Sequence, residues 1–121
     1  MVKDKTLVFG ASIKPDRYSN LAIKKLVRYN KNVRAFGLRS GLVEGVGIED
    51  ELRLHEDIDT ITLYLSPPRQ TQYYDHFVAL SPRRVIFNPG TENPQLYNIL
   101  RQHNIEVEVA CTLVLLSTNQ Y

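Results

Sequence analysis

The 121-residue chain contains no tryptophan, one methionine and a single cysteine. One cysteine excludes an internal disulfide bond and a metal site built from several cysteine ligands. Basic and acidic side chains nearly balance, with 15 of the first and 13 of the second, for a net charge of +2. A charge this small and this evenly spread does not predict a surface that binds nucleic acid.

Long apolar segments are also missing. No run approaches the roughly 20 apolar residues that a membrane-spanning helix needs. The charged start of the chain, Met-Val-Lys-Asp-Lys, has no apolar core behind it and so does not predict a secretory signal. We therefore expect a soluble cytoplasmic protein without a membrane partner. With 43% hydrophobic and 23% charged residues, the chain has the composition of a single globular domain that spans residues 1–121.

Short β-branched and aromatic runs alternate with amphipathic runs along the chain. This alternation predicts an α/β protein with an open parallel sheet covered on both faces by helices. Strands are predicted at residues 6–9, 33–36, 61–65, 85–87 and 106–109, and helices at 20–29, at 70–80 and from Asn93-Pro94 onward.

Two segments give a weaker pattern. Residues 38–60 are interpreted as a variable crossover with a short extended piece and a single helical turn at 54–58. The apolar tail at 112–116 fits either a short strand or a turn of helix, and both stay open.

The junction between the first strand and the first helix carries the strongest functional signal. Residues 10–12, Gly-Ala-Ser, are small and allow a ligand to approach the backbone closely. Pro15 stiffens the loop, and Ser19 or Asn20 is the expected N-cap of the helix. Loop amides and the positive end of the helix dipole then face one spot. Lys14 and Arg17 add two positive charges, so the loop predicts a site for a phosphorylated ligand.

The kind of phosphorylated ligand follows from what stands after the first two strands. Gly10 is not followed by the further glycines of a dinucleotide-binding Gly-x-Gly-x-x-Gly motif. No acidic residue follows the second strand, where a carboxylate would hold the free ribose hydroxyls of NAD. Arg39 stands there instead and suits a ribose phosphate. NADP and coenzyme A both carry a diphosphate and a ribose phosphate, and the residues alone do not separate them.

Residues 10–19 resemble the first-loop motif of small stand-alone CoA-binding domain proteins, which are similar to the CoA-binding domain of the succinyl-CoA synthetase alpha subunit. The resemblance continues at Asn88-Pro89-Gly90 and at residues 107–111 and covers nearly the whole chain. It implies a Rossmann-like open parallel sheet of five strands that binds CoA or an acyl-CoA non-covalently. The site residues expected from the sequence and this resemblance are Gly10, Ala11, Ser12, Ile13, Lys14, Arg17, Tyr18, Arg39, Ser66, Pro67, Asn88 and Gly90.

The chain departs from the family pattern in two places. Many members have a Pro-Val-Asn-Pro-like turn after the second strand, where this chain has Ala-Phe-Gly-Leu at 35–38. Glu108 and Ala110 stand where many members have an aspartate and a basic residue before the late cysteine. Cys111 keeps two interpretations, a small buried hydrophobe or a thiol near the pantetheine end of CoA.

No catalytic constellation stands out. His55, His76 and His103 are far apart in sequence and lack metal-ligand spacing, and Ser12 has no identifiable base. We therefore expect a non-catalytic CoA-binding module. Two alternatives stay open, a small NADP-dependent or CoA-utilising enzyme and a structural subunit of the same fold without ligand. A protein partner or a homodimer also stays open, because the apolar tail suits packing inside the domain or against a second copy.

Overall fold

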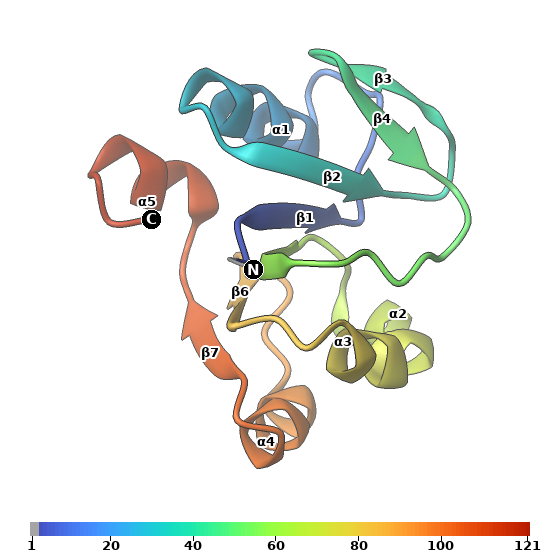
Figure 1. The fold of residues 1–121 in the computed structure, drawn as a ribbon, viewed down its shortest axis with the longest axis vertical. Helices are drawn as coiled ribbons and strands as arrows, with labels where there is room; N and C mark the ends of the chain where they lie inside the picture. The colour runs from blue at the N-terminus through green and yellow to red at the C-terminus, as the bar shows by residue number, and fades with distance from the viewer. Residues whose placement is uncertain (1–2) are drawn as a thin grey trace.

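Seven strands form one sheet in the order β3-β4-β2-β1-β5-β6-β7, in a computed structural model that describes residues 3–121 (Figure 1). Two of them form a hairpin at one end of the sheet. Its second strand runs parallel to the neighbouring β2, and its first strand is antiparallel. The parallel strands are β1 (Lys5–Phe9), β2 (Asn32–Phe36), β5 (Ile58–Leu63), β6 (Arg84–Phe87) and β7 (Glu106–Val109), and the hairpin is β3 (Gly41–Val43) and β4 (Val46–Glu49).

The sheet corrects the predicted fold in two respects. The five predicted strands correspond to the parallel ones, but the sheet has seven strands and is mixed rather than purely parallel. The hairpin lies inside the segment interpreted as a variable crossover, and its turn uses positive φ angles at Glu44 and Gly45. The predicted helical turn at 54–58 is wrong, because Ile58 already begins β5 and the residues before it are irregular.

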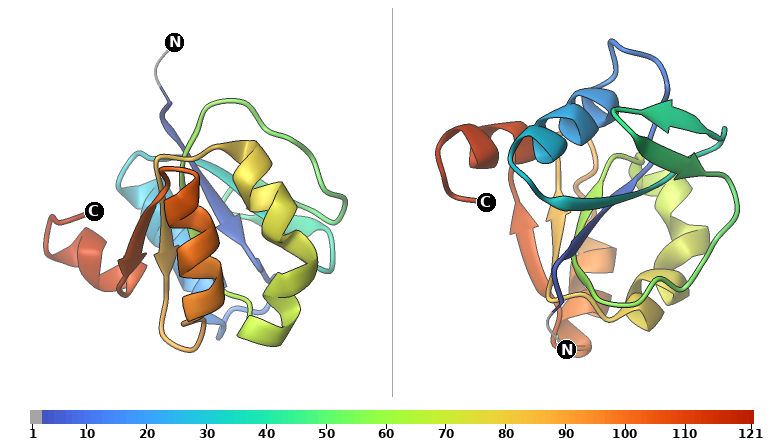
Figure 2. Two further views of the ribbon diagram at one scale, coloured as in Figure 1. Left: turned by 90° about the horizontal axis from the view of Figure 1, so that it is seen from below. Right: turned by 45° about the horizontal axis from the view of Figure 1, so that its top comes forward.

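Helices cover both faces of the sheet (Figures 1 and 2). One face carries α1 (Tyr18–Arg28) and α5 (Thr112–Ser117), which is the form taken by the apolar tail. The other carries α3 (Tyr74–Leu80) and α4 (Pro94–Gln102). The predicted helix at 70–80 is correct only from Tyr74 onward, because its first residues belong to α2 (Pro67–Gln70) and to the 3₁₀ turn η1 (Thr71–Tyr73). The helical segment thus begins at Pro67, since proline is tolerated in a first helical turn.

The core has two halves, one on each side of the sheet. Leu7 and Phe9 of β1 pack towards α3 and α4, where Phe77 and Leu100 are fully buried. Val8 points to the other face, towards Ile23 and the rest of the apolar side of α1. A central strand buried on both faces is expected for a parallel sheet covered by helices. β1 is therefore the rigid centre from which the first loop leaves.

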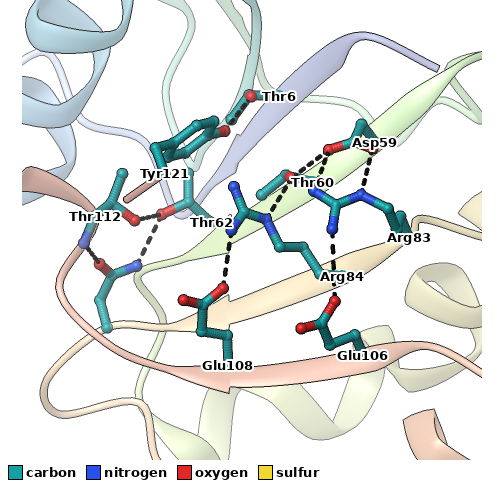
Figure 3. Close-up of polar contacts among 11 residues, drawn as sticks. Thr6, Asp59, Thr60, Thr62, Arg83, Arg84, Glu106, Glu108, Thr112 and Tyr121 are labelled. Carbon is teal, nitrogen blue, oxygen red and sulfur yellow. Dashed lines mark hydrogen bonds and ion pairs between the residues drawn. The ribbon is translucent and has the colours of Figure 1, made fainter. Parts of the chain in front are cut away.

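A polar network fastens the segment after α5 to the sheet (Figure 3). Arg84 is only 5% exposed. Its Nε donates to the Thr60 hydroxyl at 2.9 Å, and its Nη1 donates to Glu108 at 2.8 Å. The Arg84 guanidinium lies 4.4 Å from the centre of the Tyr121 ring, and the Tyr121 hydroxyl is hydrogen-bonded to the Thr6 hydroxyl. Thr6, Thr60 and Arg84 lie near the amino ends of their strands, so the network is remote from the carboxyl edge of the sheet.

Candidate functional site

The carboxyl end of β1 is the point at which the strand order reverses. The chain passes from β1 to β2 on one side and places β5 on the other side of β1. Open α/β sheets bind their ligands at such a point. The loops that follow β1, β2, β5 and β6 surround an open cavity of about 620 Å³, of the size that small-molecule sites usually have.

Small residues allow the first two of these loops to pack against each other. Gly10 has a φ of +94°, and its amide and that of Ala11 both donate to the Phe36 carbonyl, at 2.9 and 2.8 Å. A Cβ atom on Gly37 would lie 2.2 Å from the Ala11 carbonyl oxygen. The amides of Gly10 and Ala11 are therefore used by the fold, contrary to the expectation that they face a ligand.

The free amides lie further along the loop and in the first turn of α1. In the part of the chain that the structure describes, the amides of Ser12, Ile13, Tyr18 and Ser19 donate no hydrogen bond. The Ser12 hydroxyl accepts from the Lys14 amide at 3.1 Å, which leaves its own hydrogen available to a ligand. These groups lie at the start of the helix, where free amides favour an anion, and we call them the anion-binding corner.

The N-cap of α1 differs from the prediction. The helix begins at Tyr18, with Arg17 at the cap position and no side-chain cap, so neither Ser19 nor Asn20 is the N-cap. The Asn20 side chain instead donates to the Ser12 carbonyl at 3.0 Å. This bond ties the middle of the loop to the first helical turn and fixes the anion-binding corner.

Four cationic side chains line the cavity, Lys14 and Arg17 on the first loop, Arg39 after β2, and Arg69 on α2. Over residues 3–121, none of the four side chains takes part in a hydrogen bond or an ion pair, and no Asp or Glu lines the cavity. Arg53, Arg83 and Arg84, by contrast, pair with carboxylates, as Arg83 does with Asp59 at 2.8 Å. The cavity therefore concentrates positive charge that the protein itself does not balance.

The structure brings all but two of the predicted site residues to the cavity. Asn88 is 2% exposed and its amide is fully used: Nδ2 donates to the Thr62 hydroxyl at 2.8 Å, and Oδ1 accepts from the Thr112 amide at 2.9 Å. Asn88 thus fixes the start of α5 from beneath the site. Pro67 begins α2 and does not line the cavity.

Several lining residues were missed from the sequence. Arg69 carried a signal, since it stands three residues after Ser66 at the carboxyl edge, but its short helix was not predicted to begin there. Tyr73 falls within the helix predicted at 70–80, and no role in the site was predicted for it. Its ring makes edge-on contacts with Phe9 and Phe36, at centroid distances of 5.0 and 5.8 Å, and still lines the cavity.

Titratable groups other than the four cations contribute less to the charge of the cavity. Burial raises the pKa of the cavity-lining Tyr64 to about 12, so its hydroxyl stays protonated at neutral pH. Cys111 is half-buried, directly precedes α5 and does not line the cavity.

Among residues 3–121, no group of three His, Cys, Asp or Glu side chains is placed to hold a metal ion. Across the same residues, no helix combines the length and apolar character that crossing a bilayer requires.

Comparisons with known proteins concern the family and the fold of the chain. The family described as "CoA binding domain" matches residues 4–117. A crystal structure of an uncharacterized protein is 40% identical, with a TM-score of 0.95 and full coverage of both chains. The cell-free ID.343 protein of Thermus thermophilus is 21% identical over 98% of this chain and 91% of its own, with a TM-score of 0.85.

A more distant structure contains this fold as one part of a longer chain. It is the dinucleotide forming acetyl-coenzyme A synthetase 1 of Ca. Korarchaeum cryptofilum, in complex with phosphate and ADP. The match is 13% identical, covers 88% of this chain and 25% of the synthetase, and has a TM-score of 0.71. At this identity the likeness concerns the fold alone. No curated protein matches the chain.

Proposed function

The chain belongs to the family of CoA-binding domains, and we propose that its cavity binds coenzyme A or an acyl-CoA without catalysing a reaction. The observation that carries this proposal is the set of unbalanced cations at the carboxyl edge. Lys14, Arg17, Arg39 and Arg69 surround one cavity that no carboxylate of the described chain lines. Such a site favours a ligand with several negative charges.

Coenzyme A has the charge that this cavity lacks. Its diphosphate carries one negative charge on each phosphoryl group, and its ribose phosphate is a monoester, with a charge of about −1.5 to −2 at neutral pH. The total is close to the four positive charges of the lining. Arginine binds phosphate oxygens with two parallel hydrogen bonds, which adds geometric selectivity to the attraction.

In our proposal the diphosphate lies over the anion-binding corner of Ser12, Ile13, Tyr18 and Ser19. Their free amides and the positive end of the α1 dipole stabilise an anion there. The uncharged pantetheine arm then extends towards the loop after β6, where the lining residues 89–91 are Pro-Gly-Thr. Gly90 leaves open space on that side, since a Cβ atom there would meet nothing within 4 Å.

The lining groups are suited to binding rather than to proton transfer. General acid–base catalysis works best with a group whose pKa lies near the working pH. Arginine and lysine side chains serve here as charged hydrogen-bond donors to a ligand, and Tyr64 has its pKa raised to about 12. We therefore propose a role in holding the ligand, with sensing, carrying or delivery to a partner as the cellular use.

A thermal-shift panel tests the proposal with CoA, acetyl-CoA, NAD, NADP and ATP. We expect CoA or acetyl-CoA to raise the melting temperature most, because ligand binding to the native state alone stabilises it. Arg17→Met should weaken CoA binding by roughly 10- to 100-fold, the range for a lost charge-assisted hydrogen bond of about 1.5–3 kcal/mol. Arg28→Met, at the far end of α1, is the matched control and should bind CoA as the wild type does.

The panel also separates the alternatives. A preference for NADP over CoA, accompanied by turnover, would replace the binding module with a small reductase. A melting temperature that no ligand shifts would contradict the proposal and support a structural subunit. Equal stabilisation of the wild type and of Arg17→Met by CoA would remove the first loop from the ligand site.

A further inference from the structure

The near balance of charge over the whole chain hides two segments of opposite sign. Residues 10–43 contain eight Lys and Arg side chains and one Asp, whereas residues 44–57 contain six Asp and Glu side chains and one Arg. The two segments meet at the β3–β4 hairpin, which forms one end of the sheet (Figures 1 and 2). Surfaces of opposite charge therefore adjoin this hairpin in the chain.

The positive surface at this end of the sheet belongs to the mouth of the cavity. Ile13, Lys14, Leu38 and Arg39 all line the cavity, and we call them the basic rim. Leu38 is 75% exposed and Ile13 is 47% exposed. Ile13 lies against the hairpin, since a Cβ atom on Gly41 would come within 2.3 Å of its Cγ2 atom. Exposed apolar side chains that gather beside polar ones are typical of an interaction surface.

The negative surface is formed by residues 50–57, which connect β4 to β5 and which we call the acidic segment. Asp50 and Glu51 are exposed, and no side chain within residues 3–121 pairs with either carboxylate. The arginine of the segment does not neutralise them, because Arg53 pairs with Glu49 at 3.2 Å. The acidic segment thus carries negative charge that its own chain does not balance.

Exposed leucines accompany the acidic side chains. Leu54 is 64% exposed and Leu52 is 46% exposed, and Leu42 on the edge strand β3 is 73% exposed. A single exposed leucine is ordinary on a protein surface. Three of them at one end of the sheet, together with Leu38 and Ile13 of the basic rim, offer apolar area whose burial would stabilise an association.

The acidic segment complements the basic rim in charge and shares its apolar character. Within the part of the chain that the structure describes, no ion pair joins the two surfaces. The rim residues of the second loop directly precede the hairpin, and the acidic segment directly follows it. A two-fold axis beside the hairpin therefore brings the rim of each copy against the acidic segment of the other, and both contacts form at once.

We propose that a second copy of this chain docks its acidic segment on the basic rim when the cavity holds no ligand, and that CoA displaces it. The carboxylates of the segment and the phosphates of CoA need the same Lys14 and Arg39 side chains, so one occupant excludes the other. The association is independent of the proposed function, whereas its release by CoA rests on that function and adds regulation to the site.

Sedimentation velocity of the ligand-free protein and of two charge-swapped double variants tests the association. The wild type should dimerise as its concentration rises. Lys14→Glu with Arg39→Glu makes both surfaces acidic, and Asp50→Lys with Glu51→Lys makes both basic, so each variant alone should sediment as a monomer. An equal mixture of the two variants should form the dimer again, because each rim then meets a segment of opposite charge.

Two controls match these variants. Asp4→Lys with Glu106→Lys makes the same change of net charge at exposed carboxylates, one of them on β7 at the opposite edge of the sheet, and should dimerise as the wild type does. Leu54→Ser should weaken the dimer at least fivefold. Val114→Ser, at a valine of α5 that is 55% exposed, should leave the dimer unchanged. Circular dichroism checks the folding of each variant.

CoA connects the association to the cavity. Saturating CoA should convert the wild-type dimer to the monomer, since binding to one state alone shifts the equilibrium towards that state. The variant with Asp50→Lys and Glu51→Lys keeps every residue of the cavity. In calorimetry it should bind CoA at least as tightly as the wild type, because no docked segment competes with the ligand.

The outcomes separate this inference from the proposed function. A wild type that stays monomeric at every soluble concentration would overturn the association, as would a mixture of the charge-swapped variants that fails to dimerise. A dimer that persists at saturating CoA would overturn the competition and leave CoA binding intact. Failure of CoA to bind would overturn the proposed function and the release of the dimer, while the ligand-free mixture still decides the association.

Discussion

Gly37 is the residue at which the site tolerates least change. A side chain there meets the Ala11 carbonyl oxygen, which belongs to the loop that forms the anion-binding corner. The Phe36 carbonyl just before it accepts from two amides of the same loop. The geometry of the first loop therefore depends on a residue of the second.

Gly37→Ala should lower the free energy of unfolding by about 1–3 kcal/mol, the usual cost of overpacking, and should also weaken CoA binding. Urea denaturation and calorimetry measure the two effects. Gly47→Ala is the matched control: a Cβ atom there meets nothing within 4 Å, so stability should change by no more than about 0.5 kcal/mol. If Gly37→Ala matched the Gly47 variant, the close packing of the two loops would be refuted.

Two histidines make stability depend on pH. Burial lowers the pKa of His55, against the opposing effect of Glu49, whose carboxylate lies 3.0 Å from Nε2. Burial also lowers the pKa of His76, and the nearby His55 lowers it further. Both folded-state pKa values thus lie below the ordinary value of 6.5. As the pH falls below that value, the unfolded state takes up protons first.

The free energy of unfolding should therefore be flat above about pH 6.5 with respect to these groups and fall below it. The slope for each histidine is at most about 1.4 kcal/mol per pH unit. Urea denaturation at pH 7.5 and 5.5 measures the loss. The double variant His55→Gln, His76→Gln should show a smaller loss over this interval, and an unchanged loss would exclude these side chains as its source.

At the residue scale, the sequence predicts some of the site residues and their roles but not the others. The small residues and charges of the first loop predict an anion site, because both are local properties. The use of the Gly10 and Ala11 amides by Phe36 was not predictable, since it depends on how two distant loops pack. Arg69 was missed because the helix was predicted to begin at residue 70, whereas α2 begins at Pro67, a residue type that often begins helices.

At the scale of elements, the packing of α5 depends on the network of Arg84, Tyr121 and Thr6. Tyr121 is half-buried, lies over the Arg84 guanidinium and bonds to Thr6. Without Tyr121, Arg84 would be a buried cation whose one ion-pair partner within residues 3–121 is Glu108. The Tyr121 ring thus covers a charge and holds the segment after α5 against β1.

Tyr121→Ala should lower the free energy of unfolding by about 3 kcal/mol, through lost burial and the lost cation–π contact. Tyr121→Phe keeps the ring and should cost about 1 kcal/mol. Tyr29→Ala removes a tyrosine that is 44% exposed and serves as the control, with a smaller effect. Chemical denaturation ranks the three, and a Tyr121→Ala protein as stable as the control would contradict this role. CoA affinity should not change, because the network is remote from the cavity.

Elements with a β-branched and aromatic run or a clear helical period were predictable, and the hairpin was not. The five parallel strands follow from short β-branched and aromatic runs, and the helices at 18–28 and 94–102 follow from amphipathic runs. Strands β3 and β4 contain three and four residues, and a glycine in each one, Gly41 and Gly47, weakens the apolar pattern. Their Glu-Gly turn also lacks the Asn-Gly or Asp-Gly signal that marks a tight hairpin.

For the whole molecule, the distribution of charge matters more than its sum. A net charge of +2 does not reveal that four cations without partners in the described chain surround one cavity, because composition averages over the surface. The fold produces this concentration by bringing together the carboxyl ends of β1, β2 and β5, which lie far apart in sequence. The strand order that achieves this could not be predicted from the sequence, although the alternation of strands and helices could.

A crystal structure of the protein with CoA tests the central claim most directly. We predict density for the diphosphate within hydrogen-bonding distance of the amides of Ser12, Ile13, Tyr18 and Ser19, with the Arg17 side chain on a phosphoryl oxygen. Crystals grown at a CoA concentration that saturates binding in solution, yet with this corner of the cavity empty or with CoA bound elsewhere on the protein, would contradict the account.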